Sequence, residues 1–265
     1  MKGYIHSIET LAAADGPGIR TAVFMQGCNL RCRYCHNPDT WNREQGTGNR
    51  EQVYSVDGLF NKLIRYKEYY GKDGGVTASG GEPLLQAEFL TAVFQKLKAS
   101  GINTALDTAG TVLNDNVKAL LDYTDLVILD VKHTESKAYD DICGMADGNL
   151  PRPRQEVCAG TPSCRRGIFE KVIDFLEYCA GQKKRIWLRQ VIIPNINDSK
   201  EQVLELKKLA DKYKVEKVEL LPYHTMGVSK WEKLGLEYSL KDIPPADEKT
   251  IQRLQKTASP TLCRS

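Results

Sequence analysis

The stretch from Thr21 to His36, TAVFMQGCNLRCRYCH, decides how this chain of 265 residues is interpreted. Its first six residues form an apolar run of the kind that becomes a buried β-strand. Three cysteines follow directly, Cys28, Cys32 and Cys35, with the spacing CxxxCxxC. A strand that ends at three closely spaced thiols predicts a ligand site at the carboxyl end of that strand.

The chemistry of the three cysteines limits which metal or cluster they can bind. Soft thiolates select zinc, copper(I) or iron–sulfur clusters. A structural zinc site uses four ligands, commonly two separated pairs, but no second pair stands at a usual distance here, and His36 is too close to Cys35 to share its metal. Three thiolates on a cluster of four irons leave one iron without a protein ligand. An open iron of that kind can bind a chelating substrate.

Further apolar runs predict a parallel sheet. Segments with helical periodicity alternate with them, which is typical of right-handed βαβ units. Six such units predict an α/β fold, a partial (β/α)6 TIM-like barrel whose active site lies at the C-terminal strand ends. The runs after Thr21–Gln26 are Gly75–Ala78, Thr104–Asp107, Leu126–Asp130, Ile186–Ile193 and Lys217–Leu221.

Composition predicts one globular domain over residues 1–257. Hydrophobic residues make up 41% of the chain and charged residues 27%, and the net charge is only +3, so we expect no nucleic-acid partner. The first ten residues contain no secretory core, and no later stretch is long and apolar enough for a membrane span, so we expect a cytoplasmic protein. Residues 150–167 are interpreted as a loop insertion and residues 258–265 as a loose tail.

The other five of the eight cysteines are scattered. We interpret them as core or surface thiols, since a reducing cytosol does not favour disulfides. Cys158 and Cys164 lie in the insertion; the absence of further paired cysteines nearby favours free loop thiols over a second cluster.

Polar residues and glycines follow four of the predicted strands. Adjacent glycines let a ligand approach the backbone closely, although a simple turn explains them equally well. Two carboxylates at one rim need a cation or a ligand between them, whereas each alone could cap a helix. A lone histidine there is more often a surface or capping residue. These residues are Gly80, Gly81 and Glu82, then Asp107 and Thr108, then Asp130, and finally His224.

The cysteine motif after the first barrel strand resembles the signature of the radical S-adenosylmethionine (SAM) superfamily. The resemblance implies a 4Fe-4S cluster whose open iron binds the amino and carboxylate groups of SAM. It also implies reductive cleavage of SAM to a 5′-deoxyadenosyl radical. The hard chemistry then belongs to the cofactors, while the protein supplies their positions.

Longer motifs resemble those of pyruvate formate-lyase activating enzymes. These motifs are IHSIE at 5–9, DGPGIR at 15–20, YCHN at 34–37, DTW at 39–41, GGVTASGGE at 74–82 and LPYH at 221–224. The resemblance implies that the chain removes an α-hydrogen from a glycine of pyruvate formate-lyase, with reduced flavodoxin as electron donor. We expect a monomer.

The same resemblance implies roles for individual residues. Cys28, Cys32 and Cys35 hold the cluster, and Ala109 departs from the family pattern, which often has asparagine there. The cofactor is bordered by Tyr34, Cys35 and His36 at the adenine, by Gly80, Gly81 and Glu82 at the methionine end, and by Asp130, Val131, Lys132 and His224 along the rest. Asp107, Thr108 and Asp130 form a candidate site for a monovalent cation.

Two kinds of alternative remain. One is another radical SAM enzyme on the same scaffold, such as an anaerobic ribonucleotide reductase activator or a carboxy-deazaguanine synthase. The other is a zinc-stabilised binding module that uses the same cysteines. Residues 36–73 lack the extra cysteines of other glycyl-radical enzyme activators, which favours the pyruvate formate-lyase type. Metal content separates the radical enzyme from the zinc module.

Overall fold

The computed structural model describes residues 1–41, 52–144 and 167–260. Within these ranges eight strands form one sheet in the order β3-β1-β2-β4-β5-β6-β7-β8. From β2 onward every neighbouring pair in that order is parallel, whereas β1 pairs antiparallel with both β2 and β3. The strands are β1 (Lys2–Ala12), β2 (Arg20–Met25), β3 (Gln52–Ser55), β4 (Gly75–Gly80), β5 (Asn103–Thr108), β6 (Leu126–Asp130), β7 (Arg185–Ile192) and β8 (Lys217–Pro222).

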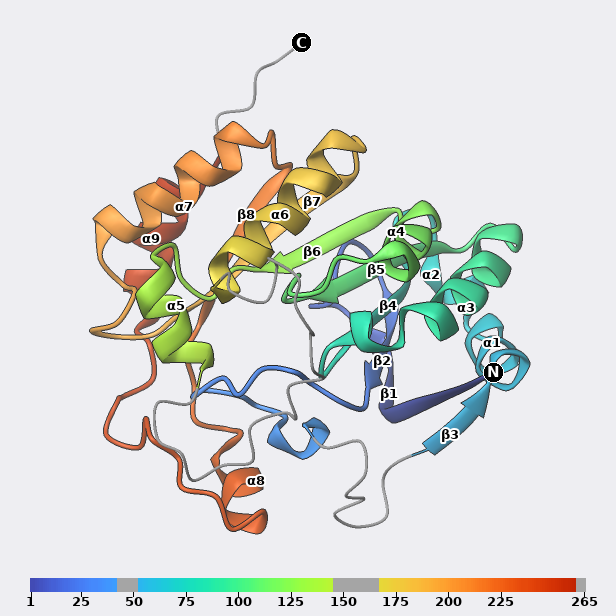
Figure 1. Cartoon of the computed structure of the whole chain (residues 1–265), viewed down its shortest axis with the longest axis horizontal. Helices are drawn as coiled ribbons and strands as arrows, with labels where there is room; N and C mark the ends of the chain where they lie inside the picture. The colour runs from blue at the N-terminus through green and yellow to red at the C-terminus, as the bar shows by residue number, and fades with distance from the viewer. Residues whose placement is uncertain (42–51, 145–166, 261–265) are drawn as a thin grey trace, which may run out of the picture.

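Helices follow the parallel strands and flank the curved sheet (Figure 1). The sheet is open, because its edge strands β3 and β8 do not pair. This is the partial barrel that the six apolar runs predicted. The helices are α1 (Val56–Ile64), α2 (Lys67–Tyr70), α3 (Ala87–Ala99), α4 (Asp115–Asp122), α5 (Ser136–Cys143), α6 (Ile168–Gly181), α7 (Lys200–Lys212), α8 (Val228–Lys233) and α9 (Glu248–Ala258), with short 3-10 turns at η1 (Pro38–Thr40) and η2 (Pro83–Gln86).

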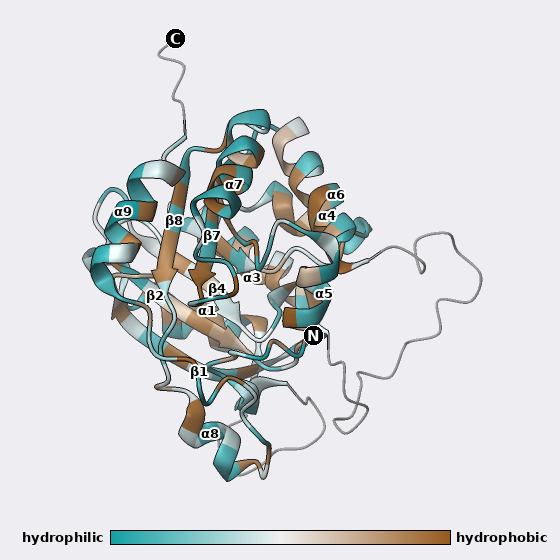
Figure 2. Ribbon diagram, turned by 90° about the vertical axis from the view of Figure 1, so that its left-hand side faces the viewer, coloured by the Kyte–Doolittle hydropathy of each residue, from teal (hydrophilic) through white to brown (hydrophobic). Residues whose placement is uncertain are grey.

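Local signals explain where several helices begin. The side chains of Ser55, Asn114, Ser199 and Asp247 each accept a hydrogen bond from the backbone N–H three residues on. Such N-caps satisfy backbone donors that the first turn of a helix leaves unpaired. Beyond the caps, each of these helices is amphipathic, and Figure 2 shows hydrophilic outer surfaces on α7 and α9 beside the hydrophobic strand β8. Burial of the apolar side of each helix therefore fixes its orientation on the sheet.

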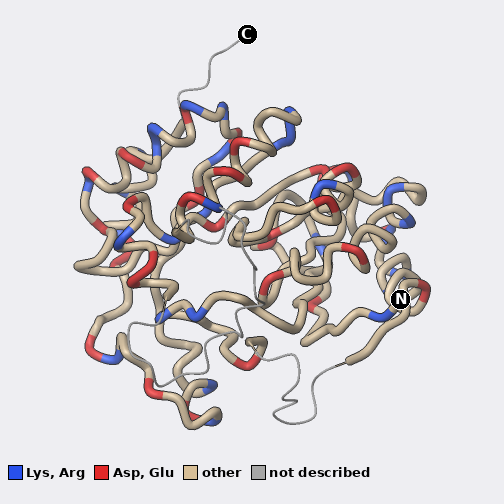
Figure 3. The backbone as a smooth tube through the Cα atoms, viewed as in Figure 1, with Lys and Arg blue, Asp and Glu red and all other residues tan. Residues whose placement is uncertain are grey.

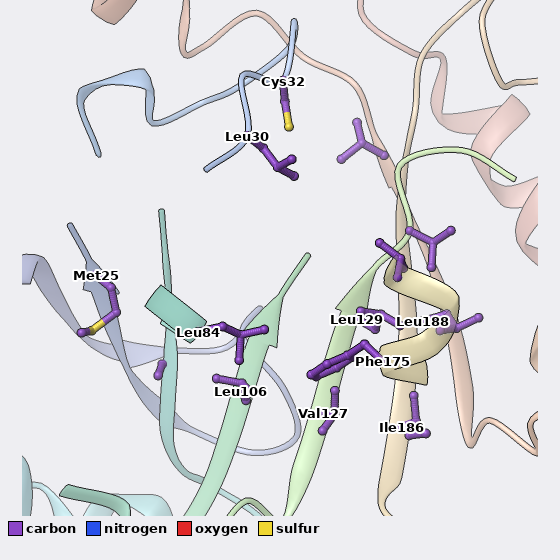
Figure 4. Close-up of a cluster of buried hydrophobic side chains, with 14 of the residues drawn as sticks. Met25, Leu30, Cys32, Leu84, Leu106, Val127, Leu129, Phe175, Ile186 and Leu188 are labelled. Atoms are coloured by element: carbon purple, nitrogen blue, oxygen red, sulfur yellow. The ribbon is translucent and has the colours of Figure 1, made fainter. Parts of the chain in front are cut away.

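The alternating side chains of the strands divide the core. On β6, Val127 and Leu129 point toward the helices and belong to the main core, where Phe175 of α6 packs (Figure 4). Leu126 and Ile128 belong to a separate small cluster with Ala105 and Trp187. A strand with both faces buried reads as a continuous apolar run, which is why β6 was predictable from its sequence. Polar residues are therefore found at the ends of such strands.

A buried arginine braces the strands at the end opposite the cysteines. Arg20 begins β2 and has no exposed surface. Its guanidinium donates hydrogen bonds to Thr77 Oγ1 at 2.7 Å, Val76 O at 3.0 Å and Asn103 Oδ1 at 2.9 Å. Burial lowers its pKa to about 10, so it remains charged at neutral pH. Arg20 therefore links β2, β4 and β5 within the fold.

The sequence predictions for the elements largely hold. All six predicted strands are present with ends shifted by at most two residues, but β1 and β3 were not predicted. Lys and Arg are interspersed with Asp and Glu along the chain (Figure 3). Ala258, the first residue of the predicted tail, is buried at the end of α9, whereas residues 150–166 of the predicted insertion and 261–265 of the tail lie outside the described residues. Within the described ranges, no helix has the length and apolar character needed to cross a membrane.

Candidate functional site

A cavity of about 250 Å³ lies at the C-terminal ends of the parallel strands. Most of the residues that line it come from the loop after β2 and from β4, β5, β6, β7 and β8 or the turns that follow them. The rim of a parallel barrel collects side chains from many strands, so distant sequence segments meet there. The predicted residues on its wall are Cys28, Cys32, Tyr34, Cys35, His36, Gly80, Gly81, Asp107, Thr108, Asp130 and Lys132.

The cysteine loop lies over these strand ends, where Figure 4 shows Cys32 and Leu30. Backbone hydrogen bonds hold it: Cys28 N–H donates to Trp41 O at 3.2 Å, and Cys35 N–H donates to Cys32 O at 3.0 Å. The indole N–H of Trp231, on α8, donates to Cys35 O at 2.8 Å. The loop is thus supported both by the following turn and by a helix about 200 residues away in the chain.

The three thiols suit an iron–sulfur cluster in their chemistry. Burial raises the pKa of Cys28 and raises that of Cys35 to about 12, so a thiolate-bound cluster must displace their protons. Within the described ranges, no three His, Cys, Asp or Glu side chains converge closely enough for a single metal ion. Three soft thiols around one cavity are the donor set expected for a cluster with an open iron.

The glycine turn after β4 packs directly on the cysteine loop. Gly80 has a φ of +106°, a conformation that side chains disfavour. Gly81 N–H donates to Met25 O at 3.0 Å, and Glu82 N–H donates to Gly27 O at 2.8 Å. A Cβ on Gly81 would lie 2.2 Å from Gly27 O. The glycines therefore permit close approach of two backbones as well as exposure of the turn to the cavity.

Glu82 lies behind the cavity wall and does not line it. Its carboxylate is buried and accepts hydrogen bonds from Thr108 Oγ1 at 2.6 Å, Ala109 N at 2.9 Å and Leu84 N at 3.0 Å. Burial raises its pKa against the lowering effect of these bonds. Glu82 therefore joins the glycine turn to the turn after β5. In this position it braces the cavity wall.

The positively charged side chains of Arg189 and Lys132 offset the charges of the two predicted carboxylates. Asp107 accepts a hydrogen bond from Ser79 Oγ at 2.9 Å and pairs with Arg189 at 3.3 Å. Asp130 pairs with Lys132. Pairing with opposite charge makes two carboxylates at one rim electrostatically acceptable. The cation site predicted at Asp107, Thr108 and Asp130 stays a prediction.

Arg189 is a cavity residue that sequence reasoning missed. It lies on β7, bridges Asp107 and Glu219 and donates to Ala14 O at 2.8 Å. A signal was present, because Arg189 and Gln190 interrupt the otherwise apolar run IWLRQVII. Burial of a charged side chain in the middle of a strand costs free energy unless the charge has partners. Such a residue therefore indicates an unusual position in the strand.

Two predicted histidines pack against each other at the rim. The rings of His36 and His224 stack with centroids 3.9 Å apart and planes inclined by 11°. Burial lowers the pKa of both, which favours neutral imidazoles at neutral pH. His36 lines the cavity, whereas His224 stacks on His36 without lining the cavity; Val131 is fully buried and does not line it either.

Among the described residues, eight buried side-chain polar atoms have no hydrogen-bond partner, and three of the eight belong to predicted cofactor-binding residues. These three are Tyr34 OH, Asp130 Oδ1 and His224 Nδ1. Buried polar atoms in proteins are normally hydrogen-bonded, so unpaired ones beside a cavity suggest a polar ligand. All three belong to residues that the sequence assigned to SAM, whose hydroxyl and amino groups are suitable partners. The residues present therefore fit this cofactor.

Comparison with known proteins agrees with this fold. The family model "Radical SAM superfamily" matches residues 22–207. Among solved structures, SuiB of Streptococcus suis bound to S-adenosylmethionine superposes with a TM-score of 0.58 at 18% identity, over 86% of this chain and 44% of that one. The fold and the site thus define a radical SAM enzyme with its cluster motif in the loop after β2.

Closer relatives define the family within that class. The pyruvate formate-lyase-activating enzyme of Clostridium pasteurianum is 44% identical over 96% of both chains. That of Staphylococcus epidermidis is 36% identical over 95% of this chain and 93% of the relative. The chain belongs to the family of pyruvate formate-lyase-activating enzymes. This membership supports the sequence interpretation over the zinc-stabilised module and the other radical SAM enzymes.

Proposed function

We propose that this chain activates pyruvate formate-lyase by generating a glycyl radical in it. When bound, the 4Fe-4S cluster and SAM supply a 5′-deoxyadenosyl radical that abstracts a glycine α-hydrogen. One observation carries the proposal: three thiols line the same cavity as unpaired buried atoms of Tyr34 and Asp130. A cluster and a polar nucleoside cofactor can therefore lie side by side in that cavity.

The residues of the chain then have distinct tasks. Cys28, Cys32 and Cys35 hold the cluster, and the Gly80–Gly81 turn allows the methionine end of SAM to approach the backbone. Asp130, which pairs with Lys132, offers Oδ1 to a hydrogen-bond donor of the cofactor. Tyr34 and His36 border the adenine, with His224 stacked behind His36.

Three finer assignments belong to the same proposal. We propose a monovalent cation beside Asp107, Thr108 and Asp130, which is supported by Asp130 Oδ1, a buried carboxylate oxygen without a hydrogen-bond partner among the described residues. We also propose reduced flavodoxin as electron donor; the partial exposure of Cys28 and Cys35 supports electron transfer from an external donor. Finally, we propose a monomer, which sedimentation of the anaerobic protein tests.

The decisive experiment is anaerobic incubation of the reconstituted chain with reductant, SAM and pyruvate formate-lyase. We expect a glycine-centred doublet in the electron paramagnetic resonance (EPR) spectrum and four irons and four sulfides per chain. Cys28→Ala is the matched control and should lose both the cluster and the doublet, since two thiolates hold a cubane poorly. A zinc-containing, colourless protein without the doublet would refute the proposal.

A further inference from the structure

A fourth cysteine lies beside the cysteine loop. Cys143 is the last residue of α5, and its backbone oxygen accepts a hydrogen bond from Arg31 N–H at 3.1 Å. The preceding residue, Ile142, accepts one from Arg33 N–H at 2.9 Å. These two bonds flank Cys32, so the end of α5 holds the middle of the cysteine loop.

The thiol of Cys143 contacts the thiol of Cys32. The two Sγ atoms lie 3.8 Å apart, a distance suited to an S–H···S hydrogen bond, and both cysteines are free rather than disulfide-bonded. Cys143 is 2% exposed and Cys32 is 8% exposed, so little water competes for the contact. The contact joins residues 111 positions apart in the chain.

Once the cluster is bound, only Cys143 of these two cysteines can carry a proton on its sulfur. Cysteine ligates iron as a thiolate, so a ligating Cys32 carries no proton and can only accept. Cys143 is not one of the three motif cysteines and keeps its S–H. The geometry then makes Cys143 the donor and a cluster ligand the acceptor.

We propose that Cys143 donates an S–H···S hydrogen bond to the cluster ligand Cys32 and thereby raises the reduction potential of the cluster. The inference rests on the proposed function, because it requires the 4Fe-4S cluster. Reduction adds negative charge to the cluster, and a donor to a ligand sulfur stabilises that charge. In a buried site the effect is strengthened because the local dielectric constant is low. Cys143 is therefore a positioning residue that acts through Cys32.

The test measures the potential directly. Reconstituted protein is titrated anaerobically with the reduced cluster followed by EPR, in the absence of SAM and pyruvate formate-lyase. Cys143→Ala removes the donor and should shift the potential to a more negative value at unchanged iron content. Cys143→Ser keeps a donor and should shift it less. Cys179→Ala is the matched control, since Cys179 is an equally buried thiol on α6 that does not line the cavity, and it should leave the potential unchanged.

Each outcome decides the question. A Cys143→Ala potential equal to or above that of the wild type would overturn the inference, even if the enzyme still activates its target. If that variant does not hold a full cluster, the potential of Cys143→Val is compared with that of the wild type instead, because valine fills the space without supplying a donor. Failure of both variants to hold the cluster would also overturn it, because Cys143 would then serve assembly. Failure of the wild type to bind a 4Fe-4S cluster would instead refute the proposed function.

Discussion

Substitution of Gly81 by alanine tests how tightly the glycine turn must pack on the cysteine loop. An alanine Cβ at this position would lie 2.2 Å from Gly27 O and 3.3 Å from Met25 O. Non-bonded heavy atoms are most favourable at about 3.5 Å, so the two backbones must separate by roughly 1.3 Å. The clashing atoms are Gly27 O and Gly27 C, the latter at 2.8 Å; both belong to the backbone next to the cysteine loop and cannot rotate away.

The cost follows from two contributions. Overpacking of a buried contact costs about 1–3 kcal/mol. Separation also breaks the hydrogen bond from Glu82 N–H to Gly27 O, which contributes about 1 kcal/mol. We therefore expect Gly81→Ala to lower the free energy of unfolding by about 2–4 kcal/mol. A displacement of about 1 Å at the site should also weaken SAM binding or turnover by about 100-fold.

Two other glycines serve as matched controls for the same chemical change. Gly181 ends α6 with no atom within 4 Å of an added Cβ and without a positive φ, so alanine there should be neutral or stabilise by about 0.4–1 kcal/mol. Gly101 also has open space but a φ of +71°, so alanine should cost about 1–2 kcal/mol through backbone strain alone.

The assay is urea unfolding of each anaerobically reconstituted variant, together with SAM affinity measured by isothermal titration calorimetry. We expect the order of stability Gly181→Ala, Gly101→Ala, Gly81→Ala, and a loss of SAM affinity only in the last. If Gly81→Ala were as stable as Gly181→Ala and bound SAM with wild-type affinity, the packing argument would be wrong.

Three further predictions concern carboxylates. Glu82→Gln replaces one carboxylate oxygen by an N–H₂ group, which faces either Ala109 N–H or both Thr108 Oγ1–H and Leu84 N–H. At least one donor then loses its acceptor, and urea unfolding should show a loss of about 1–3 kcal/mol. Asp130→Ala should keep the full iron content but weaken SAM binding by about 10- to 100-fold, because it removes a buried charged acceptor; unchanged affinity by calorimetry would contradict its assignment. The hydrogen bonds from Arg185 lower the pKa of Glu216 below its ordinary 4.5, so this ion pair stabilises the fold above that pH and the contribution disappears as pH falls through the folded pKa. Because both side chains are largely exposed, Glu216→Gln should cost only about 0.5 kcal/mol at pH 7. The cost should vanish once the pH lies well below the lowered pKa of Glu216, as thermal unfolding across pH can show.

Several features could be predicted from the sequence because they are local. An apolar run such as LVILD at 126–130 has both faces buried, and its composition alone indicates a strand. Cys28, Cys32 and Cys35 lie within eight residues, so their spacing alone predicts that they bind a common ligand. The rule that ligands lie at the carboxyl ends of parallel barrel strands then joins strand and cysteines into one candidate site. Strands β1 and β3 escaped prediction because their pairing is antiparallel at the sheet edge, where the residues are less uniformly apolar.

Other features depend on contacts that no short stretch of sequence contains. Glu82 has the position of a motif residue, but only the fold shows that its carboxylate turns away from the cavity to Thr108 and Ala109. Arg189 meets Asp107 across 82 residues of chain. Cys143, which the sequence leaves among scattered thiols, reaches Cys32 only because α5 ends against the cysteine loop.

The division has a physical reason. Periodicity and ligand spacing are properties of neighbouring residues, so the sequence by itself determined the parallel strands, the cluster motif and the rim at which they meet. Which side of each turn faces the cavity, and which charges and thiols pair across it, depends on how separate βαβ units pack together. Those pairings were decided only by the tertiary structure.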